Sequence, residues 1–554
     1  MGNYISKFNT TAEFDTFITT SECLKPHVSL TKDNHKVHYI DYSHKYLTFV
    51  ALENGTFTLT IGSGVSASIL SSVSYSTDDG ETWISTNNQD DTTVTITTPT
   101  ISQGNKVLWK GVGTAMSIAT NNTAQANMPS SSSIFSSTKR FNAEGNVMSL
   151  LYGDSFEDKT TFANGSSSNF ALLFYQATKL VSASNVHMAA RIAKDYTYLR
   201  MFYSCTSLTT APELPATTLA NYCYTSMFQG CYSMTTAPEL LATTLANYCY
   251  TSMFNACQAL ATAPELPATA LTTSCYSYMF NGCTSLTTAP ELPATTLASL
   301  CYQHMFDGCT SLTAAPELPA TALTTSCYQG MFRYCTSLTT APELLATRLA
   351  SNCYQQMFYK CQALATAPEL PATTLVNNCY QEMFYSCTSL TTAPELPATA
   401  LTTSCYTSMF YGCTSLTTAP ELPATKLAIS CYSYMFYKCT SLTTAPELLA
   451  TALTTSCYFY MFNSCTSLTT APELPARTLV NNCYQEMFGG CSNLNYIKTM
   501  FTTEPSTTYM NGWVNGVASS GTFIMNSNAD WNTGTTACGI STYPCDWTVE
   551  TASS

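Results

Sequence analysis

The middle of the chain repeats one pattern of hydrophobic and polar residues every 26 positions. The dipeptide Met-Phe begins at twelve positions with this spacing, the first at Met201 and the last at Met487. From Cys205 to Gly490 the spacing gives eleven complete units without an insertion. A strict period of this length is typical of proteins in which similar structural units stack into a solenoid.

Within a unit, constant and variable positions separate as they would on an amphipathic helix. Six positions hardly change between units, and in the first unit they hold Leu219, Cys223, Tyr224, Met227, Phe228 and Cys231. Six others vary, and there they hold Asn221, Tyr222, Thr225, Ser226, Gln229 and Gly230. At about 100° per residue the constant positions cover one side of a helix. This predicts a short helix that ends near Gly230.

The other half of each unit predicts a strand and a turn. Residues 208–214 of the first unit are too few, and too close to a proline, for a second helix. Leu208, Ala211 and Leu214 are expected to face inward. The predicted fold class is therefore an α/β solenoid, a leucine-rich-repeat-like array of strand-helix units. Because an array cannot end on bare apolar units, capping modules are expected.

The flanks predict β structure. Five short segments between residues 46 and 120 alternate as strands do, and an Asp79-Gly80 turn lies among them, which favours an N-terminal β-sandwich module. The predicted order is a docking module at 1–45, the β module at 46–120, a linker and N-terminal cap of the solenoid at 121–204, the repeats at 205–490 and a C-terminal β cap at 491–554.

The repeat resembles a known family. Its M-F-x-x-C-T-S-L, followed by L-P-A-T-x-L, is similar to the Treponema-type, BspA-like leucine-rich repeat, in which A-F-x-x-C-x-x-L and L-P-x-x-L occupy the same places. Met stands here for the family's Ala, and A-P-E-L replaces its Ile-rich strand. The resemblance implies a right-handed solenoid and a role in adhesion or binding rather than catalysis.

A second resemblance covers the flanks. The stretch from Tyr75 to Trp83 looks like one found in immunoglobulin-like modules. With Gly145 to Gly153 and Gly516 to Phe523, it is similar to proteins of gut Bacteroidales bacteria and of their tailed phages, including crAss-like phages. This resemblance implies a virion component more readily than a secreted adhesin.

Charge narrows the classes of function. Only 10% of the residues are charged, and the net charge of −13 disfavours a nucleic-acid partner. Between residues 205 and 490, 14 acidic and six basic residues contribute −8 of that charge. We expect no membrane span, because about 18 uninterrupted apolar residues are absent, and no secretory leader at the N-terminus.

Cysteine is the first candidate for chemistry. Of 26 cysteines, 23 lie in the array at alternating separations of 8 and 18 residues, without the close pairs that metal sites favour. We expect ladders of buried reduced thiols, with disulfides between units as the alternative. Cys23, His27, His35 and His38 have a spacing that only weakly suggests zinc.

One glutamate per unit, from Glu213 to Glu473, predicts a like-charge row. These carboxylates are expected to be solvated or bonded to turn amides, with a row of divalent cations as the alternative. Because they share one environment, they do not resemble a general acid and base pair. No catalytic residue, metal site or cofactor is predicted.

The variable positions predict a binding surface rich in tyrosine among Asn, Gln, Ser and Gly, a composition typical of antibody paratopes. The candidate binding residues are Tyr222, Tyr248, Tyr278, Tyr334, Tyr359, Tyr385, Tyr411, Tyr434, Tyr437 and Tyr460, with His304 at an equivalent position. The surface is expected to bind a glycan by aromatic stacking, or a protein. An ordinary exposed face is the alternative.

The sequence thus favours a non-enzymatic fibre or appendage protein of a phage virion. Its repeats would bind a bacterial surface glycan or protein receptor, and its N-terminal module would bind other virion proteins. A homo-oligomer is expected. The alternatives are a structural spacer or decoration protein of the virion and a bacterial cell-surface adhesin.

Overall fold

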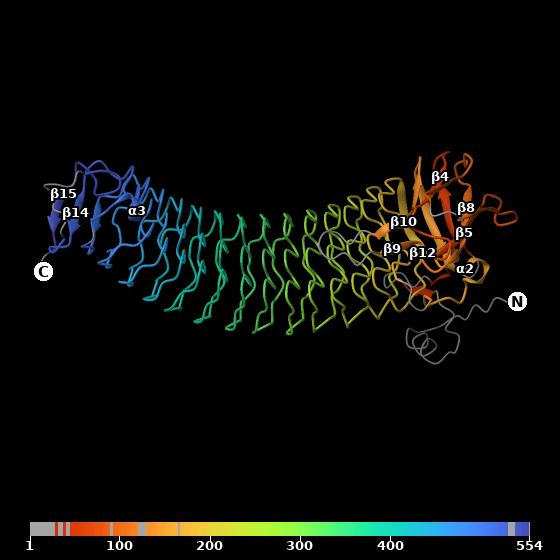
Figure 1. Ribbon diagram of the computed structural model, residues 1–554, viewed down its shortest axis with the longest axis horizontal. Helices are drawn as coiled ribbons and strands as arrows, with labels where there is room; N and C mark the ends of the chain where they lie inside the picture. Colours follow the sequence, from red (N-terminus) through yellow and green to blue (C-terminus); the bar gives the residue numbers. More distant parts are fainter. Residues whose placement is uncertain are drawn as a thin grey trace.

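The computed structural model describes residues 28–30, 37–39, 45–88, 92–119, 129–163, 167–502, 504–529 and 538–552. The repeats form a long, gently curved array, with β-sheets at its N-terminal end and a small sheet at its C-terminal end (Figure 1). Most of the predicted 1–45 module, with Cys23, His27 and His35, lies outside the described residues.

Three sheets precede the array. β1 (Val28–Leu30) pairs with β2 (Val37–Tyr39). A four-stranded sheet has the order β7 (Val94–Thr97), β4 (Phe57–Ile61), β10 (Pro129–Ser137), β9 (Ser117–Ala119). A six-stranded sheet has the order β12 (Leu180–His187), β11 (Phe141–Asn146), β3 (Leu47–Ala51), β8 (Lys106–Gly113), β5 (Leu70–Ser76), β6 (Ile84–Asn87). The five predicted strand segments correspond to β3, β4, β5, β7 and β8.

The two larger sheets contact one another through aromatic side chains. The ring centroids of Phe49 on β3 and Phe57 on β4 are 5.4 Å apart, and those of Trp109 on β8 and Phe135 on β10 are 4.9 Å apart. A short helix α2 (Ser149–Tyr152) and the 3-10 turn η1 (Gly153–Ser155) follow β11. Because β10, β11 and β12 all lie beyond residue 120, the sheets extend into the segment predicted as linker and cap.

The Asp-Gly turn joins β5 to β6. Asp79 and Gly80 both have positive φ, 58° and 94°, as a type I′ turn requires. The Asp78 carboxylate accepts hydrogen bonds from Ser76 and Thr82, which lower its pKa to about 2. These bonds give the Tyr75 to Trp83 stretch a role in the turn itself.

The predicted helix of each unit is wrong. Among the described residues the only α-helices are α2 and α3 (Thr507–Met510), and both lie outside the eleven units. Residues 221–230 instead form overlapping turns, in which Cys223, Thr225 and Met227 donate their N–H to the carbonyl three residues earlier. Positive φ recurs at every fourth residue, at Tyr222, Ser226 and Gly230. We call this segment of each unit the turn coil.

A four-residue period explains the error. The buried positions of Cys223, Met227 and Cys231 are four residues apart, which a helix of 3.6 residues per turn imitates over a short stretch. In a true helix each such step would drift by about 40°. The predicted separation into constant inward and variable outward positions holds, because both geometries place neighbouring pairs of residues on opposite sides.

The remaining amides join one turn coil to the next. Tyr222, Tyr224, Ser226, Phe228 and Gly230 donate their N–H to carbonyls 25 residues later, at N···O distances of 3.1, 3.0, 2.8, 2.9 and 2.8 Å. All five bonds run in the same direction, and the pattern recurs along the array. Each turn coil therefore presents N–H groups to the following coil and carbonyls to the preceding one.

The predicted strand of each unit is reduced to single parallel bridges. Thr210 pairs with Thr236, and Thr218 with Thr244, and similar bridges recur along the array. Leu208 and Leu214 are buried as predicted, and Ala211 is partly buried. The array is thus held together mainly by the turn coils and by its core.

The core consists of columns of identical side chains. The rings of Tyr250 and Tyr276 stack at 5.9 Å between centroids, and those of Phe254 and Phe280 at 5.7 Å. All 23 array cysteines are buried free thiols, as predicted, and not disulfides between units. Cys231 Sγ donates to the carbonyl of Phe202 at 3.1 Å. Burial raises the pKa of the Cys223 thiol to about 12.

The N-terminal β-sheets cover the first turn coil, residues 168–176. Its carbonyls would otherwise lack donors, because no earlier coil exists. Met116 and Phe135 donate their N–H to Asn169 and Leu173 at 2.7 and 2.8 Å, and Ser117 Oγ donates to Ala171 at 2.5 Å. The carbonyl row at this end is therefore satisfied by the chain itself.

At the other end, the last turn coil, residues 508–516, receives hydrogen bonds from Phe488 and Gly490 at 2.8 and 2.6 Å. A parallel sheet β13 (Tyr496–Lys498), β14 (Thr522–Met525), β15 (Thr548–Thr551) lies beside it. A disulfide that the sequence had not suggested joins Cys538 to Cys545. The loop that it closes accepts a 2.9 Å hydrogen bond from Trp513 Nε1 at the carbonyl of Thr542.

Candidate binding surface on the turn coils

The variable positions of the turn coils form outward columns, because equivalent residues lie one unit apart. All ten predicted tyrosines are half-buried. They fall into four columns: Tyr222 and Tyr248; Tyr278, Tyr434 and Tyr460; Tyr359, Tyr385, Tyr411 and Tyr437; and Tyr334 alone. His304, in the column of Tyr278, is buried at 7% exposure and belongs to the interior rather than to the surface.

Four tyrosines of one column stack continuously. The centroids of Tyr359, Tyr385, Tyr411 and Tyr437 are separated by 4.5, 4.2 and 4.6 Å. Tyr385 and Tyr411 contact rings on both faces, so they present only edges and hydroxyl groups. The predicted stacking of sugar rings on these faces is therefore not available inside the column.

Three further tyrosines extend this row at its ends. Tyr334 meets Tyr359 edge-on at 5.5 Å. Tyr434 contacts Tyr437 at 5.8 Å and stacks on Tyr460 at 5.0 Å. We call these seven residues, Tyr334, Tyr359, Tyr385, Tyr411, Tyr434, Tyr437 and Tyr460, the tyrosine ladder; it crosses six consecutive units.

The other predicted tyrosines lie apart from the ladder. Tyr222 and Tyr248 stack on each other at 4.6 Å, near the N-terminal end of the array. Tyr278 stacks on the buried His304 at 4.9 Å. The structure therefore brings seven of the ten candidates into one surface and leaves three outside it.

Three of the six basic residues of the repeats border the ladder. The Arg333 guanidinium lies 4.9 Å from the Tyr334 centroid and 5.1 Å from that of Tyr359. Lys360 Nζ lies 5.2 Å from the Tyr334 ring, and Lys438 Nζ lies 5.3 Å from the Tyr437 ring. These are cation–π distances. Acidic groups lie nearby as well, since Glu382 helps to raise the pKa values of Tyr359 and Tyr385, so charges of both signs border the ladder.

A row of glutamine amides runs beside the ladder. The row consists of Gln303, Gln329, Gln355 and Gln381, and each of the first three donates Nε2–H to the Oε1 of the next, at 2.9, 2.8 and 3.0 Å. Sequence reasoning missed this row, although glutamine at one position of four consecutive units was visible. Because each amide bonds to its neighbour, the row fixes the side chains next to the tyrosines.

Three ladder hydroxyls, those of Tyr359, Tyr385 and Tyr434, have raised pKa values. Burial raises the pKa values of Tyr359 and Tyr434, and neighbouring tyrosines raise them further. The pKa of Tyr385 is raised by burial and by its hydrogen bond with Tyr411. These three residues therefore offer neutral O–H groups at neutral pH, able both to donate and to accept hydrogen bonds.

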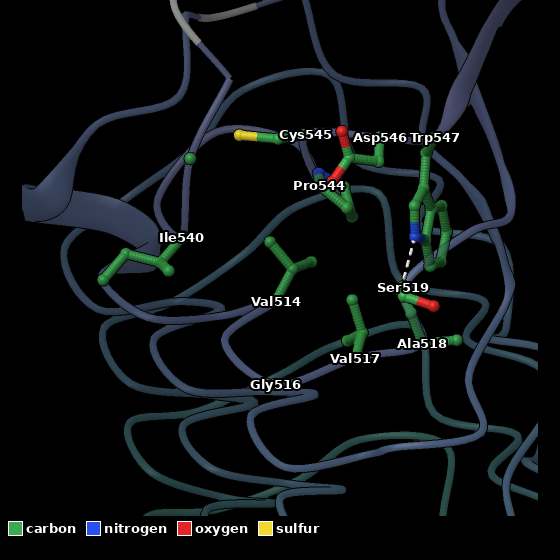
Figure 2. A pocket seen from close by; sticks show the side chains of 11 residues that line it. Val514, Gly516, Val517, Ala518, Ser519, Ile540, Pro544, Cys545, Asp546 and Trp547 are labelled. Carbon is green, nitrogen blue, oxygen red and sulfur yellow. Dashed lines mark hydrogen bonds between the residues drawn. The ribbon is translucent and has the colours of Figure 1, made fainter.

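The row of eleven glutamates from Glu213 to Glu473 lies outside the tyrosine ladder, and every member is exposed. In the described part of the chain, no three His, Cys, Asp or Glu side chains are grouped closely enough to hold a metal ion. A cavity of about 190 Å³ lies at the C-terminal end of the array, between the last turn coil and the disulfide loop (Figure 2).

Comparison with known proteins agrees with the repeat. A family model described as BspA type leucine rich repeat region, in six copies, matches residues 174–313, 251–391, 304–443 and 377–511. Together these matches span residues 174 to 511, more than half of the chain. No curated protein matches the sequence. Over the described ranges, no helix has the length and apolar character needed to cross a bilayer.

Proposed function

The chain belongs to the BspA-type leucine-rich repeat family, and from that premise we propose that it is a non-enzymatic binding protein whose tyrosine ladder contacts a receptor on a bacterial surface. The repeat family favours a surface-binding, adhesin-like role. The observation that carries the proposal is the contiguity of seven half-buried tyrosines at variable positions of six consecutive units.

The geometry of the ladder favours a protein receptor over a glycan. Tyr385 and Tyr411 have both ring faces covered, so a ligand meets ring edges and hydroxyls. Such groups give apolar contact and hydrogen bonds at small cost in side-chain entropy, as in antibody paratopes. A sugar ring would find a free tyrosine face only at the ends of the column.

For the setting, we propose a phage virion, in which the chain is a fibre or appendage and its N-terminal module attaches it to other virion proteins. The support is the resemblance of the flanking segments to proteins of Bacteroidales phages. A bacterial cell-surface adhesin would use the same ladder. A structural spacer would not need it, since a spacer requires only the stacked core.

The test uses the full chain and intact host cells. Tyr359, Tyr385 and Tyr411 are replaced together by serine, and the matched control replaces Tyr222 and Tyr248, which are stacked and half-buried but lie outside the ladder. We expect the triple variant to lose at least tenfold in affinity and the control to bind normally. Equal binding by the two variants would refute the ladder as the receptor site.

A further inference from the structure

The charged groups beside the tyrosine ladder are of two kinds, acids that the chain itself bonds and cations that it does not. Three acidic side chains lie at the variable positions of the repeats. Each is within hydrogen-bond distance of another side chain of the array. The pairs are Asp307 Oδ2 with His304 Nδ1 at 3.1 Å, Glu382 Oε2 with Gln356 Nε2 at 2.8 Å, and Glu486 Oε2 with Asn463 Nδ2 at 3.3 Å. These carboxylates are therefore already bonded within the protein.

The three cations beside the ladder lack such partners. In the described part of the chain, the side chains of Arg333, Lys360 and Lys438 make no hydrogen bond. The Arg333 guanidinium comes within 3.9 Å of Asp307 Oδ2, which is longer than a hydrogen bond. Its buried Nε has no acceptor among the described residues. Because an unsatisfied buried N–H is costly, the Arg333 guanidinium is suited to an acceptor that comes from outside.

Two of the cations and two of the tyrosines form a square on the surface. Arg333 and Tyr334 are neighbours in one unit, and Tyr359 and Lys360 occupy the same positions in the next unit. The cations therefore stand at opposite corners. The Arg333 guanidinium lies 4.9 and 5.1 Å from the centroids of Tyr334 and Tyr359, and Lys360 Nζ lies 5.2 and 5.5 Å from them.

The tyrosine rings hold these cations without using their hydrogen bonds. A cation–π contact attracts a positive charge to a ring face but leaves its N–H groups available. Half-burial of Arg333 and Lys360 restricts both side chains to the square. The guanidinium is thus positioned to bond a carboxylate through two parallel N–H groups.

A third cation lies at the other end of the tyrosine stack. The dipeptide Tyr359-Lys360 recurs three units later as Tyr437-Lys438, and Lys438 Nζ lies 5.3 Å from the Tyr437 centroid. Tyr359 and Tyr437 are the first and last rings of the continuous stack. A ligand that lies along the four rings therefore meets a positive charge at each end.

The remaining basic residues of the repeats lie on a different side of the units. Arg348 and Lys426 occupy the position of Thr218, where parallel bridges join the units, and Arg477 occupies the position of Thr217. They are distant in the unit from the variable positions of the turn coils. Only half of the six bases thus accompany the tyrosines, and the other half provide a matched control.

We propose that the tyrosine ladder binds an acidic segment of its protein receptor. Carboxylates of that segment bond Arg333 and Lys360 at one end of the stack and Lys438 at the other, and side chains between them contact the ring edges. This inference rests on the proposed function and adds the chemistry of the partner. Complementary charge of this kind gives specificity and speeds association.

The first test compares two triple variants of the full chain. The ladder-cation variant carries Arg333→Gln, Lys360→Gln and Lys438→Gln, and the control carries the same change at Arg348, Lys426 and Arg477. Both remove equal charge. We expect the ladder-cation variant to lose at least tenfold in affinity for host cells at low ionic strength, and to lose most of the salt dependence of binding, because salt screens exposed charges. The control should bind as the unmodified chain does.

Urea denaturation shows that both variants are folded before binding is compared. Equal affinity of the two folded variants for host cells would overturn the proposal. An unchanged salt dependence in the ladder-cation variant would overturn it as well.

The second test uses two anionic probes and the purified full chain. One is a fluorescent copolymer of glutamate and tyrosine, and the other is fluorescent polygalacturonate, which carries carboxylates on sugar rings. Fluorescence anisotropy measures the binding of each. We expect saturable binding of the copolymer, at least tenfold weaker with the ladder-cation variant and unchanged with the control. Absence of copolymer binding would overturn the proposal, and equal or tighter binding of polygalacturonate would assign the site to an acidic glycan instead.

The two proposals fail in different ways. If the tyrosine triple variant loses host binding while the ladder-cation variant retains it, the ladder remains the receptor site and the acidic partner is refuted. If the tyrosine triple variant binds host cells normally, the proposed function fails, whatever the cation variants do.

Discussion

The two ends of the array differ in how the chain covers the backbone groups of the terminal turn coils. At the N-terminal end, Met116 and two strand residues, Ser117 and Phe135, donate hydrogen bonds to the carbonyls of the first turn coil. At the C-terminal end, the disulfide loop and Trp547 lie over the last turn coil, joined to it by hydrogen bonds from Trp513 Nε1 to Thr542 and from Trp547 Nε1 to Ala518, at 2.9 and 2.8 Å. Because hydrogen bonds between coils all run one way, the array has chemically distinct ends. A repeat sequence alone does not reveal this polarity.

The largest expected effect is a difference in stability at high pH between the array and the β-sheets at its N-terminal end. Burial raises the pKa of array thiols from 9.0, to about 11 for Cys275 and Cys327 and higher for others. Because the folded pKa is raised, the stabilisation is complete below pH 9 and is lost as the pH rises toward 11 and beyond. At pH 10 each such thiol lowers the free energy of unfolding by about 1 kcal/mol, because the unfolded chain ionises it and the folded chain does not.

Summed over 23 thiols, this cost exceeds the stability of an ordinary domain. We expect the array to unfold in urea at much lower concentration at pH 10 than at pH 7. Residues 45–187 contain no cysteine and should keep their structure. Limited proteolysis at both pH values checks this; simultaneous loss of both regions would contradict it.

The second prediction concerns a substitution that weakens the contact between the β-sheets and the first turn coil. Phe135 is fully buried against Phe49 and Trp109, so Phe135→Ala should cost about 3–5 kcal/mol locally. Amide exchange should accelerate in residues 168–176 and remain unchanged in residues 508–516. Faster exchange at both ends would show that the ends are coupled through the array.

The third prediction concerns removal of the disulfide at the C-terminal end. Cys538→Ser with Cys545→Ser removes a closed loop of few residues, with an expected local loss of about 2–3 kcal/mol. The reporter is the fluorescence of Trp513, whose indole N–H bonds the loop. Dithiothreitol should reproduce the change in the unmodified chain. Since the array thiols are already reduced, neither treatment should alter the repeats.

The smallest effect concerns a surface ion pair at the same end. Lys498 Nζ lies 2.8 Å from Glu473 Oε2, and both side chains are partly exposed, 34% and 46%. Lys498→Ala should change the free energy of unfolding by less than about 1 kcal/mol. A larger loss, measured by urea denaturation, would mean that this pair contributes to closing the array.

Much of the array could be predicted from the sequence, because repetition substitutes for comparison with relatives. The inward positions of Cys223, Tyr224 and Phe228 followed from constancy between units, and buried thiols were the favoured alternative for the cysteines because of their spacing. The backbone did not, since a four-residue period imitates a helix over three turns. The distinction lies in hydrogen bonds to another unit, which side-chain patterns do not encode.

The candidate surface was predictable in composition but not in arrangement. Ten tyrosines at variable positions could be identified, yet their division into columns depends on which coil positions stack. The covered faces of Tyr385 and Tyr411 follow from the close spacing of the coils. The disulfide between Cys538 and Cys545 was not predicted, because both cysteines lie outside the repeats and no equivalent positions could be compared.

The polarity of the array is tested most directly by amide exchange at two equivalent glycines. Gly490 and Gly516 both have positive φ at the same position of successive coils, but only Gly490 donates to a following coil. In the free full chain, residue-resolved exchange should be slow at Gly490 and close to the unprotected rate at Gly516. Equal protection of the two amides would contradict the one-way direction of the hydrogen bonds between coils.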